Sequence, residues 1–331
     1  MHNSSFVELI EHENDDLIVL NAAKVSHKKQ AAAVDSSNDF LIRYLAKHRH
    51  FTPFGHARWG GEFFVPDVDL MIDWLMQRKP GWTIRKITTS MFEIEGSLFN
   101  WLSDLGDLPP IDSDSLLNLR SALIGSGCAE TVKAFLGDDQ FKAASDVGAS
   151  RGLIKPSSWH TFKICAPVFI LRQLMRSNHE IVYNEISRRY VNDDPTYFIP
   201  EIWRDRPPKN IKQGSGAGEV RVFDSELVNE WINTRGHFPF ALDLKTCYSD
   251  WIQTAGELYK LFDRSGVAPE MSRILLPLSM YSEVYMTCST SALNRILGLR
   301  SNKSESNHAQ KEIEQVCSAL DTIRENCKIK A

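Results

Sequence analysis

The chain of 331 residues has a formal net charge of −4 and a pI near 6.2, with 43% hydrophobic and 24% charged residues. This is the composition of an ordinary soluble globular protein, and the length indicates two domains or one domain with a large insertion. The negative net charge argues against a sequence-independent nucleic-acid binder, which is normally strongly basic. The six cysteines form no Cys-x-x-Cys pair, the first residues are acidic, and no apolar run approaches the length of a membrane span. We therefore expect a cytoplasmic protein with neither a membrane nor a nucleic acid as partner.

The first elements are predicted from capping residues and apolar spacing. Residues 6–12 are typical of a strand, and Asp15 and Asp16 can cap a helix that closes with the segment N-A-A-K-V-S. Apolar residues recur at helical spacing over residues 39–48. The aromatic content of residues 57–66 then predicts a second strand.

A turn rich in histidine, K-H-R-H-F-T-P-F-G-H, joins this helix to this strand. His48, His50 and His56 are close in sequence, but no Asp, Glu or Cys lies among them, so we predict no metal site. Two interpretations remain open at this point. The histidines can cap neighbouring elements around a Thr-Pro turn, or His50 and Thr52 can hydrogen-bond a ligand.

Residues 67–158 are predicted to be an insertion. Asp67 and Asp69 can begin a helix, and residues 104–146 are acidic and contain several Pro, Ser and Gly. This composition favours a loop-rich, mainly helical insertion over a second catalytic domain. Such an insertion could shape the entrance to a site.

The most informative stretch is residues 172–190, where arginines, glutamates and amide side chains follow an apolar run. The run over residues 158–171 predicts a strand. If a helix continues from Leu171, Gln173 and Arg176 share one face and can hold one phosphate. In an extended segment, Glu185, Ser187 and Arg189 point the same way. An exposed, salt-bridged helix is the alternative, but Asn184, Ser187 and Tyr190 are poor residues for such a surface, which favours a binding site.

The last third contains a second polar group of residues. A loop over residues 193–218 precedes helices predicted around 224–234 and 240–262. The sequence that follows these helices predicts a further helix, a break at Pro277 and a short extended piece. It then predicts a helix that is capped near Ser289 and ends at Arg300. Arg273 and Arg300 stand in apolar sequence, so they either pair with internal carboxylates or hold a ligand. A helical apolar stripe from residue 308 predicts a closing core helix or a subunit contact.

Several blocks carry a family resemblance when they are taken in order. They are N-A-A-K-V-S, H-F-T-P-F-G-H, A-P-V-F-I-L-R-Q-L-M-R, Y-N-E-I-S-R-R-Y, F-I-P-E-I-W-R and P-E-M-S-R-I-L-L-P-L-S-M-Y. In this order they resemble flavin-dependent thymidylate synthases over the whole chain except the insertion. The resemblance implies an α+β fold, with a central β-sheet flanked by helices and one catalytic domain over residues 1–331, interrupted at about 67–158. It also implies a homotetramer with active sites at subunit interfaces.

The resemblance further implies the chemistry of the site. Each site would hold FAD, a deoxyuridylate and a folate, with methylenetetrahydrofolate as carbon donor for the C5 methyl group, reduced flavin as hydride source and NADPH as reductant. Arg300 would be catalytic, stabilising negative charge on the pyrimidine ring. The implied nucleotide contacts are Gln173, Arg176, Glu185, Ser187, Arg188, Arg189, Arg273 and Arg300. The implied flavin contacts are His50, Thr52, Arg176, His179, Asn184 and Glu185.

Physical arguments agree with this resemblance on two points. A dianionic phosphate accounts for several arginines in a protein of negative net charge, because guanidinium groups bind phosphate through charge-assisted bidentate hydrogen bonds. No cysteine has an adjacent histidine or cation that would activate it, which disfavours methylation through a cysteine adduct. Ser187 also lacks a base partner, so we assign it a binding role.

The sequence departs from the family pattern near Arg176. One residue is inserted between Arg176 and Ser187, and Ser177, Asn178 and His179 replace the usual His-Arg. Gly55 stands where the family usually has Glu. These departures leave two alternatives to thymidylate synthesis: a C5 methylase or hydroxymethylase of another pyrimidine nucleotide such as UMP, or a flavin- and nucleotide-binding protein without turnover.

Overall fold

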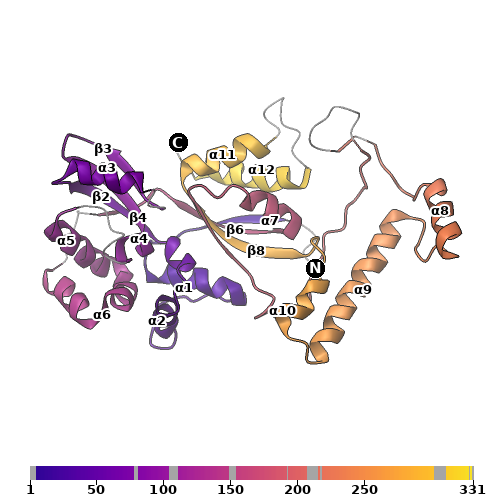
Figure 1. Cartoon of the computed structure of the whole chain (residues 1–331), viewed down its shortest axis with the longest axis horizontal. Helices are drawn as coiled ribbons and strands as arrows, with labels where there is room; N and C mark the ends of the chain where they lie inside the picture. Colours follow the sequence, from indigo (N-terminus) through magenta and orange to yellow (C-terminus); the bar gives the residue numbers. More distant parts are fainter. Residues whose placement is uncertain are drawn as a thin grey trace.

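The computed structural model describes residues 5–77, 81–103, 111–148, 154–191, 193–206, 215–216, 218–301, 311–327 and 329. It is a mixed helix and sheet structure with two antiparallel four-stranded sheets (Figure 1). Within the described ranges, no helix combines the length and the apolar character needed to cross a bilayer.

The first sheet has the strand order β1-β6-β8-β7 and joins segments far apart in the chain. Its strands are β1 (Phe6–Ile10), β6 (His160–Pro167), β8 (Tyr281–Cys288) and β7 (Ile181–Glu185). β6 and β8 pair along their whole length, from His160 opposite Cys288 to Pro167 opposite Tyr281. The predicted short extended piece after Pro277 is therefore a central strand of the fold.

The strand predicted over residues 158–171 ends earlier than expected. The chain turns at Pro167 into helix α7 (Val168–Met175), so the prediction was wrong for residues 168–171. A proline at the N-cap leaves no N–H to continue the ladder. The next two N–H groups donate to Met280 O and Leu278 O instead. Since Ile170, Leu171 and Leu174 are buried, the apolar residues line one face of a helix.

Three helices cover the apolar face of this sheet: α7, α11 (Thr290–Arg300) and α12 (Lys311–Asn326) (Figure 1). They form one hydrophobic core with Phe162 and Ile164 of β6 and Val284 and Met286 of β8. Ser289 accepts a hydrogen bond from Ala292 N at 3.0 Å, which confirms the predicted helix cap. The buried stripe of α12 confirms the predicted core helix.

The opposite face of the sheet meets the N-terminal helices. These are α1 (Asp16–Lys24), the 3-10 turn η1 (Val25–His27), α2 (Asp39–Lys47) and the 3-10 turn η2 (Thr52–Gly55). Asp15 caps α1 by accepting from Leu17 N and Ile18 N, as predicted. Phe54 of η2 and Ile18 of α1 are fully or almost fully buried in the second hydrophobic core.

The second sheet has the order β3-β4-β2-β5. It comprises β2 (Arg58–Phe64), β3 (Thr83–Lys86), β4 (Met91–Ser97) and β5 (Lys155–Pro156). Around it lie α3 (Val68–Met76), α4 (Leu98–Leu102), α5 (Ser113–Leu123), the π-helical turn η4 (Ile124–Cys128) and α6 (Ala129–Asp146). Residues 67–158 thus contribute the expected helices and also the strands that pair with β2. Their core is continuous with that of α1 and α2, since Leu98 and Leu119 pack in the same cluster as Ile18.

The remaining helices form an extension on the far side of β8 (Figure 1). They are α8 (Ser225–Arg235), α9 (Leu244–Arg264), α10 (Pro269–Ser272) and the 3-10 turn η5 (Arg273–Leu275). The helices predicted around 224–234 and 240–262 are present. This extension exposes large apolar side chains, among them Leu227, Trp251 and Leu261. Within the loop predicted over residues 193–218, residues 207–214 and 217 lie outside the described residues.

Candidate functional site

A cavity of about 350 Å³ lies where β7 ends, between α7 and the segment that connects η5 to β8. Its polar lining comes from Arg172, Glu185, Ser187, Arg188, Arg273 and Ser282. We call it the β7 pocket. It brings together four of the residues predicted to bind a nucleotide, from the middle and the last third of the chain. Pro277, which breaks the helical pattern, also lines it.

Glu185 is the acidic member of this lining. It is the last residue of β7, and its carboxylate accepts a hydrogen bond from Ser282 Oγ at 2.7 Å. Desolvation of the carboxyl group raises the pKa of Glu185, and the Ser282 hydrogen bond and the charges of Arg172 and Arg273 work against this rise. The carboxylate is thus fixed in place but not neutralised by a direct ion pair.

The arginines of the β7 pocket differ in their partners. Arg188 donates to the backbone oxygen of Asp193 at 2.7 Å and to its carboxylate at 2.8 Å, and Lys28 holds the other carboxylate oxygen at 2.8 Å. Arg172 and Arg273 are exposed and form no hydrogen bond or ion pair with any residue that the structure describes. Arg273 is therefore not buried, and two guanidinium groups remain available to an anion.

The chain turns immediately after Ser187, so the extended run predicted as far as Arg189 was wrong. Tyr190 N donates to Ser187 O at 2.9 Å, closing a turn. Ser187 Oγ accepts from Arg189 Nε at 3.3 Å, and the Arg189 guanidinium lies 5.1 Å from the Tyr190 ring centre. Arg189 is thus beside Ser187, outside the lining of the β7 pocket.

The other predicted nucleotide contacts lie elsewhere. Gln173 is half-buried on α7, and Arg176 is the exposed C-cap of that helix. Arg300 ends α11, and its Nε is buried without a hydrogen-bond partner among the described residues. None of the three lines the β7 pocket. Within a single chain, the residues predicted to bind the nucleotide therefore lie in separate places.

A directed chain of buried hydrogen bonds crosses the polar face of the first sheet. It begins where Asn14 N donates to His12 Nδ1 at 3.1 Å, which leaves His12 Nε2 as the donor to Thr161 Oγ1 at 2.7 Å. Thr161 Oγ1 then lies 2.7 Å from Thr287 Oγ1, which lies 2.6 Å from His56 Nδ1. Since each hydroxyl has one proton, each donates to the next group along the chain.

This histidine–threonine relay ends on Asn184, a predicted flavin contact. His56 Nε2 donates to Asn184 Oδ1 at 3.2 Å, and Asn184 Nδ2 donates to Ala22 O at 3.1 Å, which fixes the orientation of the amide. Burial lowers the pKa of His12 and of His56 to about 4, so both rings are neutral at neutral pH. Both nitrogens of His56 are occupied, so His56 is unsuited to bind a metal.

The turn that carries the other predicted flavin contacts lies at the surface. His50 and Thr52 are exposed, and neither lines the β7 pocket. Gly55 lies against β7: a Cβ added there would come within 3.1 Å of Val182 Cγ1. No group of three potential metal ligands converges within the described ranges.

The altered segment after Arg176 forms a constrained turn. Glu180 has a left-handed backbone with φ of 59°, which is uncommon for a residue other than glycine. Its carboxylate accepts from Ser289 Oγ at 2.7 Å, and Arg295 donates to His179 O at 2.8 Å. The His179 side chain is exposed.

Arg172 and Ser282 were not predicted from the sequence. Arg172 directly precedes Gln173 and stands four residues before Arg176, a spacing that places both arginines on one face of a helix. Arg172 lay within the helix predicted from Leu171, but only Gln173 and Arg176 were considered there as the pair that holds a phosphate. Ser282 gave no signal, since its role depends on the pairing of β8 with β7.

Comparisons with known proteins identify relatives. A family model described as "Thymidylate synthase complementing protein" matches residues 158–327. Flavin-dependent thymidylate synthase from Tropheryma whipplei is 30% identical over 224 residues, which cover 64% of this chain and 82% of that protein. The Aquifex aeolicus enzyme of the same name is 23% identical over 330 residues, or 92% of each chain.

Solved structures were compared as well. A UMP/dUMP methylase, PolB from Streptomyces cacaoi, bound with 5-Br UMP, is 20% identical and aligns with 98% of this chain and 89% of its own, at a TM-score of 0.42. The sequence comparisons confirm the resemblance to flavin-dependent thymidylate synthases. The chain belongs to the flavin-dependent thymidylate synthase family and is an enzyme of that type.

Proposed function

We propose that this protein methylates a uridylate at C5 and converts dUMP to dTMP, with methylenetetrahydrofolate as carbon donor, reduced FAD as hydride source and NADPH as reductant. The observation that carries the proposal is the β7 pocket, where Arg172 and Arg273 lie near Glu185 but form no hydrogen bond or ion pair with any described residue. A nucleotide phosphate fits two free guanidinium groups, because it accepts bidentate, charge-assisted hydrogen bonds from each.

The roles within the nucleotide site follow from geometry and charge. Arg172, Arg273 and Ser187 bind the phosphate, while Glu185, held by Ser282, accepts hydrogen bonds from the sugar or the base. Arg188 supports the pocket wall through Asp193. The pocket is about 350 Å³, within the ordinary range for a site that binds a small molecule.

Gln173, Arg176 and Arg300 complete this site from a neighbouring subunit of a homotetramer. Two observations support this assignment: none of the three lines the β7 pocket of its own chain, and the extension formed by α8 and α9 exposes large apolar side chains that a subunit contact would cover. Arg300 then stabilises negative charge on the pyrimidine ring as C5 becomes nucleophilic.

The residues assigned to FAD are compatible with a large, polar ligand. His50, Thr52, Arg176 and His179 are all exposed, and Asn184 keeps a second N–H and a second lone pair after its contacts with His56 and Ala22. The relay presents the Asn184 amide in one orientation. When bound, reduced FAD supplies a hydride, whereas the chain's own residues orient the ligands and exclude water.

The four buried cysteines support methylation without a cysteine adduct. Burial raises the pKa of Cys165 to about 11 and that of Cys288 and Cys317 to about 12, and it raises the pKa of Cys128 well above the ordinary value. A buried thiol with so high a pKa is not a nucleophile at neutral pH.

Residues 1–331 form, in this proposal, one cytoplasmic catalytic domain, with residues 67–158 as its insertion. The continuous core between α1 and the helices of that segment supports a single unit. The acidic net charge also supports a small-molecule substrate and not a nucleic acid.

The proposal is tested on the purified protein. Flavin absorbance is measured first, and release of tritium from C5-labelled dUMP or UMP is then followed with methylenetetrahydrofolate and NADPH, with the product identified by mass. We expect bound flavin, release from dUMP and a product with the mass of dTMP. Release from UMP alone would instead select the alternative pyrimidine substrate. Absence of flavin together with no release from either nucleotide would refute an enzyme of this kind.

A further inference from the structure

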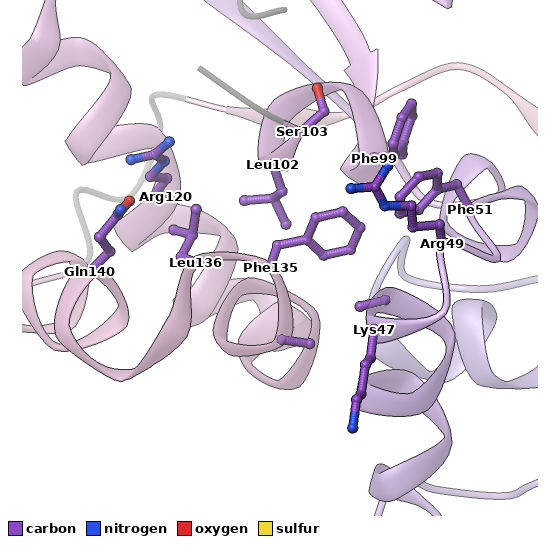
Figure 2. Close-up of a pocket in the computed structure, with 12 residues that line it drawn as sticks. Lys47, Arg49, Phe51, Phe99, Leu102, Ser103, Arg120, Phe135, Leu136 and Gln140 are labelled. Atoms are coloured by element: carbon purple, nitrogen blue, oxygen red, sulfur yellow. The ribbon is translucent and has the colours of Figure 1, made fainter. Parts of the chain in front are cut away.

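A second and larger cavity, of about 490 Å³, lies between the part of the chain predicted to be an insertion and the end of α2. It is bounded by α4, α5 and α6 on one side and by the end of α2 and the following loop on the other (Figure 2). We call it the insertion cavity. No residue assigned above to the nucleotide or to FAD lines it.

The charged residues that line the insertion cavity are all basic: Lys47, Arg49 and Arg120. Arg120 is 8% exposed, and its buried Nε has no hydrogen-bond partner among the described residues. Burial lowers the pKa of Arg120, and no carboxylate opposes that change. A guanidinium Nε that is buried without a partner is unfavourable, because it loses water without gaining a hydrogen bond or a counter-charge.

Arg58 shows how the same protein accommodates a buried arginine that is purely structural. Arg58 is 2% exposed, like Arg120 almost fully buried. Its guanidinium pairs with Glu95 at 3.4 Å, donates to Gly81 O at 2.8 Å and lies 3.7 Å from the Trp159 ring centre. Arg120 has none of these kinds of contact, so its partner is expected from outside the described chain.

The middle of the insertion cavity is apolar and aromatic. Phe51 and Phe99 stack with ring centres 4.4 Å apart, and Phe135 lies 5.9 Å from Phe51. Figure 2 shows Leu102, Leu136 and Phe135 between Arg120 and Gln140 at one end and Arg49 beside the stacked phenylalanines at the other. The ammonium group of Lys47 points away from the others in this view.

We propose that the insertion cavity binds a small organic anion with an aromatic body, such as an aryl carboxylate, whose acidic group pairs with Arg120. The ring packs against Phe135, Leu102 and Leu136, and Gln140, which lies at the Arg120 end of the cavity in Figure 2, donates a hydrogen bond to the acidic group. A bare inorganic anion would satisfy Arg120 but leave this apolar wall uncovered.

The insertion cavity also reaches the turn that carries two proposed flavin contacts. Phe51 lines the cavity, and its neighbours in sequence are His50 and Thr52. The binding site itself does not depend on the proposed methylase activity.

The test uses the full chain and isothermal titration calorimetry with three probes. They are 2-naphthoate, which has ring and charge, 2-naphthamide, which has the ring alone, and inorganic phosphate, which has the charge alone. We expect saturable binding of one naphthoate per chain, at least about tenfold tighter than either of the other two. Equal binding of phosphate, or no saturable binding of naphthoate, overturns the proposal.

Variants locate the binding. Arg120→Gln removes the charge and is expected to weaken naphthoate binding at least about tenfold, whereas Lys142→Gln, an exposed cation of α6 outside the lining, leaves it unchanged. Ala134→Met fills the cavity without altering charge and is expected to abolish binding, which keeps the test valid if Arg120→Gln folds poorly. Naphthoate binding that survives both changes refutes the assignment.

Two further measurements complete the test. The first shows whether naphthoate binds in the insertion cavity or in the β7 pocket, and the second shows whether Arg120 is paired with a carboxylate of its own chain. Excess dUMP is expected not to displace naphthoate, and displacement would place the probe in the β7 pocket and overturn the proposal. Asp104 and Asp107 follow Ser103 in the sequence, so the double variant Asp104→Asn, Asp107→Asn tests for an internal partner of Arg120. We expect an unchanged Tm and unchanged affinity; a lower Tm with tighter naphthoate binding would show internal pairing instead.

Discussion

The histidine–threonine relay and the β7 pocket lie on the same sheet. The relay side chains are hydrogen-bonded to one another, whereas two arginines of the β7 pocket are not hydrogen-bonded to any described residue. In the relay, His12, Thr161, Thr287, His56 and Asn184 form one directed series of hydrogen bonds. In the β7 pocket, Arg172 and Arg273 have no hydrogen bond or ion pair within the described residues. This difference distinguishes the relay, whose hydrogen bonds stabilise the fold, from the two arginines proposed to bind a ligand. Of these two groups, only the relay residues have hydrogen-bond partners among the described residues.

The largest expected effect concerns Arg300, whose buried Nε has no hydrogen-bond partner among the described residues. Arg300→Ala is predicted to reduce turnover at least about a thousandfold, since it removes a charge proposed to act on the developing anion of the pyrimidine ring. Flavin binding should be retained. Single-turnover kinetics and flavin absorbance measure the two properties separately. An unchanged rate would refute the catalytic role of Arg300.

The relay is broken by Thr287→Val, which leaves the Thr161 hydroxyl proton without an acceptor and His56 Nδ1 without a donor in a buried region. We expect a loss of roughly 2–4 kcal/mol in the free energy of unfolding, because two buried polar groups lose their hydrogen bond. Urea unfolding measures the change. The control is Thr322→Val, whose hydroxyl bonds to Ser318 O on the exposed side of α12 and should cost far less. Equal losses would contradict a special role for the relay.

Arg273→Ala should weaken dUMP binding and leave the free energy of unfolding unchanged, in contrast to Thr287→Val. Loss of one guanidinium–phosphate contact predicts a rise of roughly 10- to 100-fold in the KM for dUMP. The urea midpoint should not move, because Arg273 has no internal partner within the described residues. Arg264→Ala, an exposed arginine at the end of α9, is the matched control. If Arg273→Ala unfolds more readily but binds dUMP normally, Arg273 serves the fold.

The pH dependence of stability tests the two histidines of the relay. The folded-state pKa of His12 and His56 lies near 4, below the ordinary value of 6.5. Their contribution to stability is therefore present above pH 6.5 and is lost as the pH falls from 6.5 towards 4, by at most about 1.4 kcal/mol per pH unit for each histidine. Asp16, whose pKa is raised to about 6 by burial, acts in the opposite direction over the same range.

The histidine contribution is isolated by comparing variants. His56→Gln should flatten the decline of the free energy of unfolding between pH 6.5 and 4, whereas His237→Gln, an exposed histidine of the extension, should leave the slope as it is. Urea unfolding at several pH values provides the slopes. Parallel slopes for wild type and His56→Gln would contradict a neutral, buried His56.

Features set by neighbouring residues could be predicted from the sequence. The helix caps at Asp15, Asp67 and Ser289 act within three residues, so their chemistry is visible in a short window. The start of α7 was missed because an apolar run of that length fits a strand or a helix, and Pro167 decided between them. β4 was not recognised because its stabilising partner is β2, a strand some thirty residues earlier.

The site could be predicted only in part, for the same reason. The family resemblance located Glu185, Ser187, Arg188 and Arg273, which the fold then brings to one pocket. The relay connects residues separated by more than one hundred positions, and no local pattern links them. Arg120 gave no signal either, since an arginine on a helix becomes informative only when its burial and its lack of a partner are known.

The close contact between Gly55 and β7 limits which side chains residue 55 accepts. The resemblance implies a glutamate at this position in the family, yet a Cβ at residue 55 would lie 3.1 Å from Val182 Cγ1, so Val182 would have to shift by a few tenths of an ångström. Gly55→Glu is therefore expected to be tolerated better together with Val182→Ala than alone. The two positions are thus expected to be coupled, so that the effect of a change at one depends on the residue at the other.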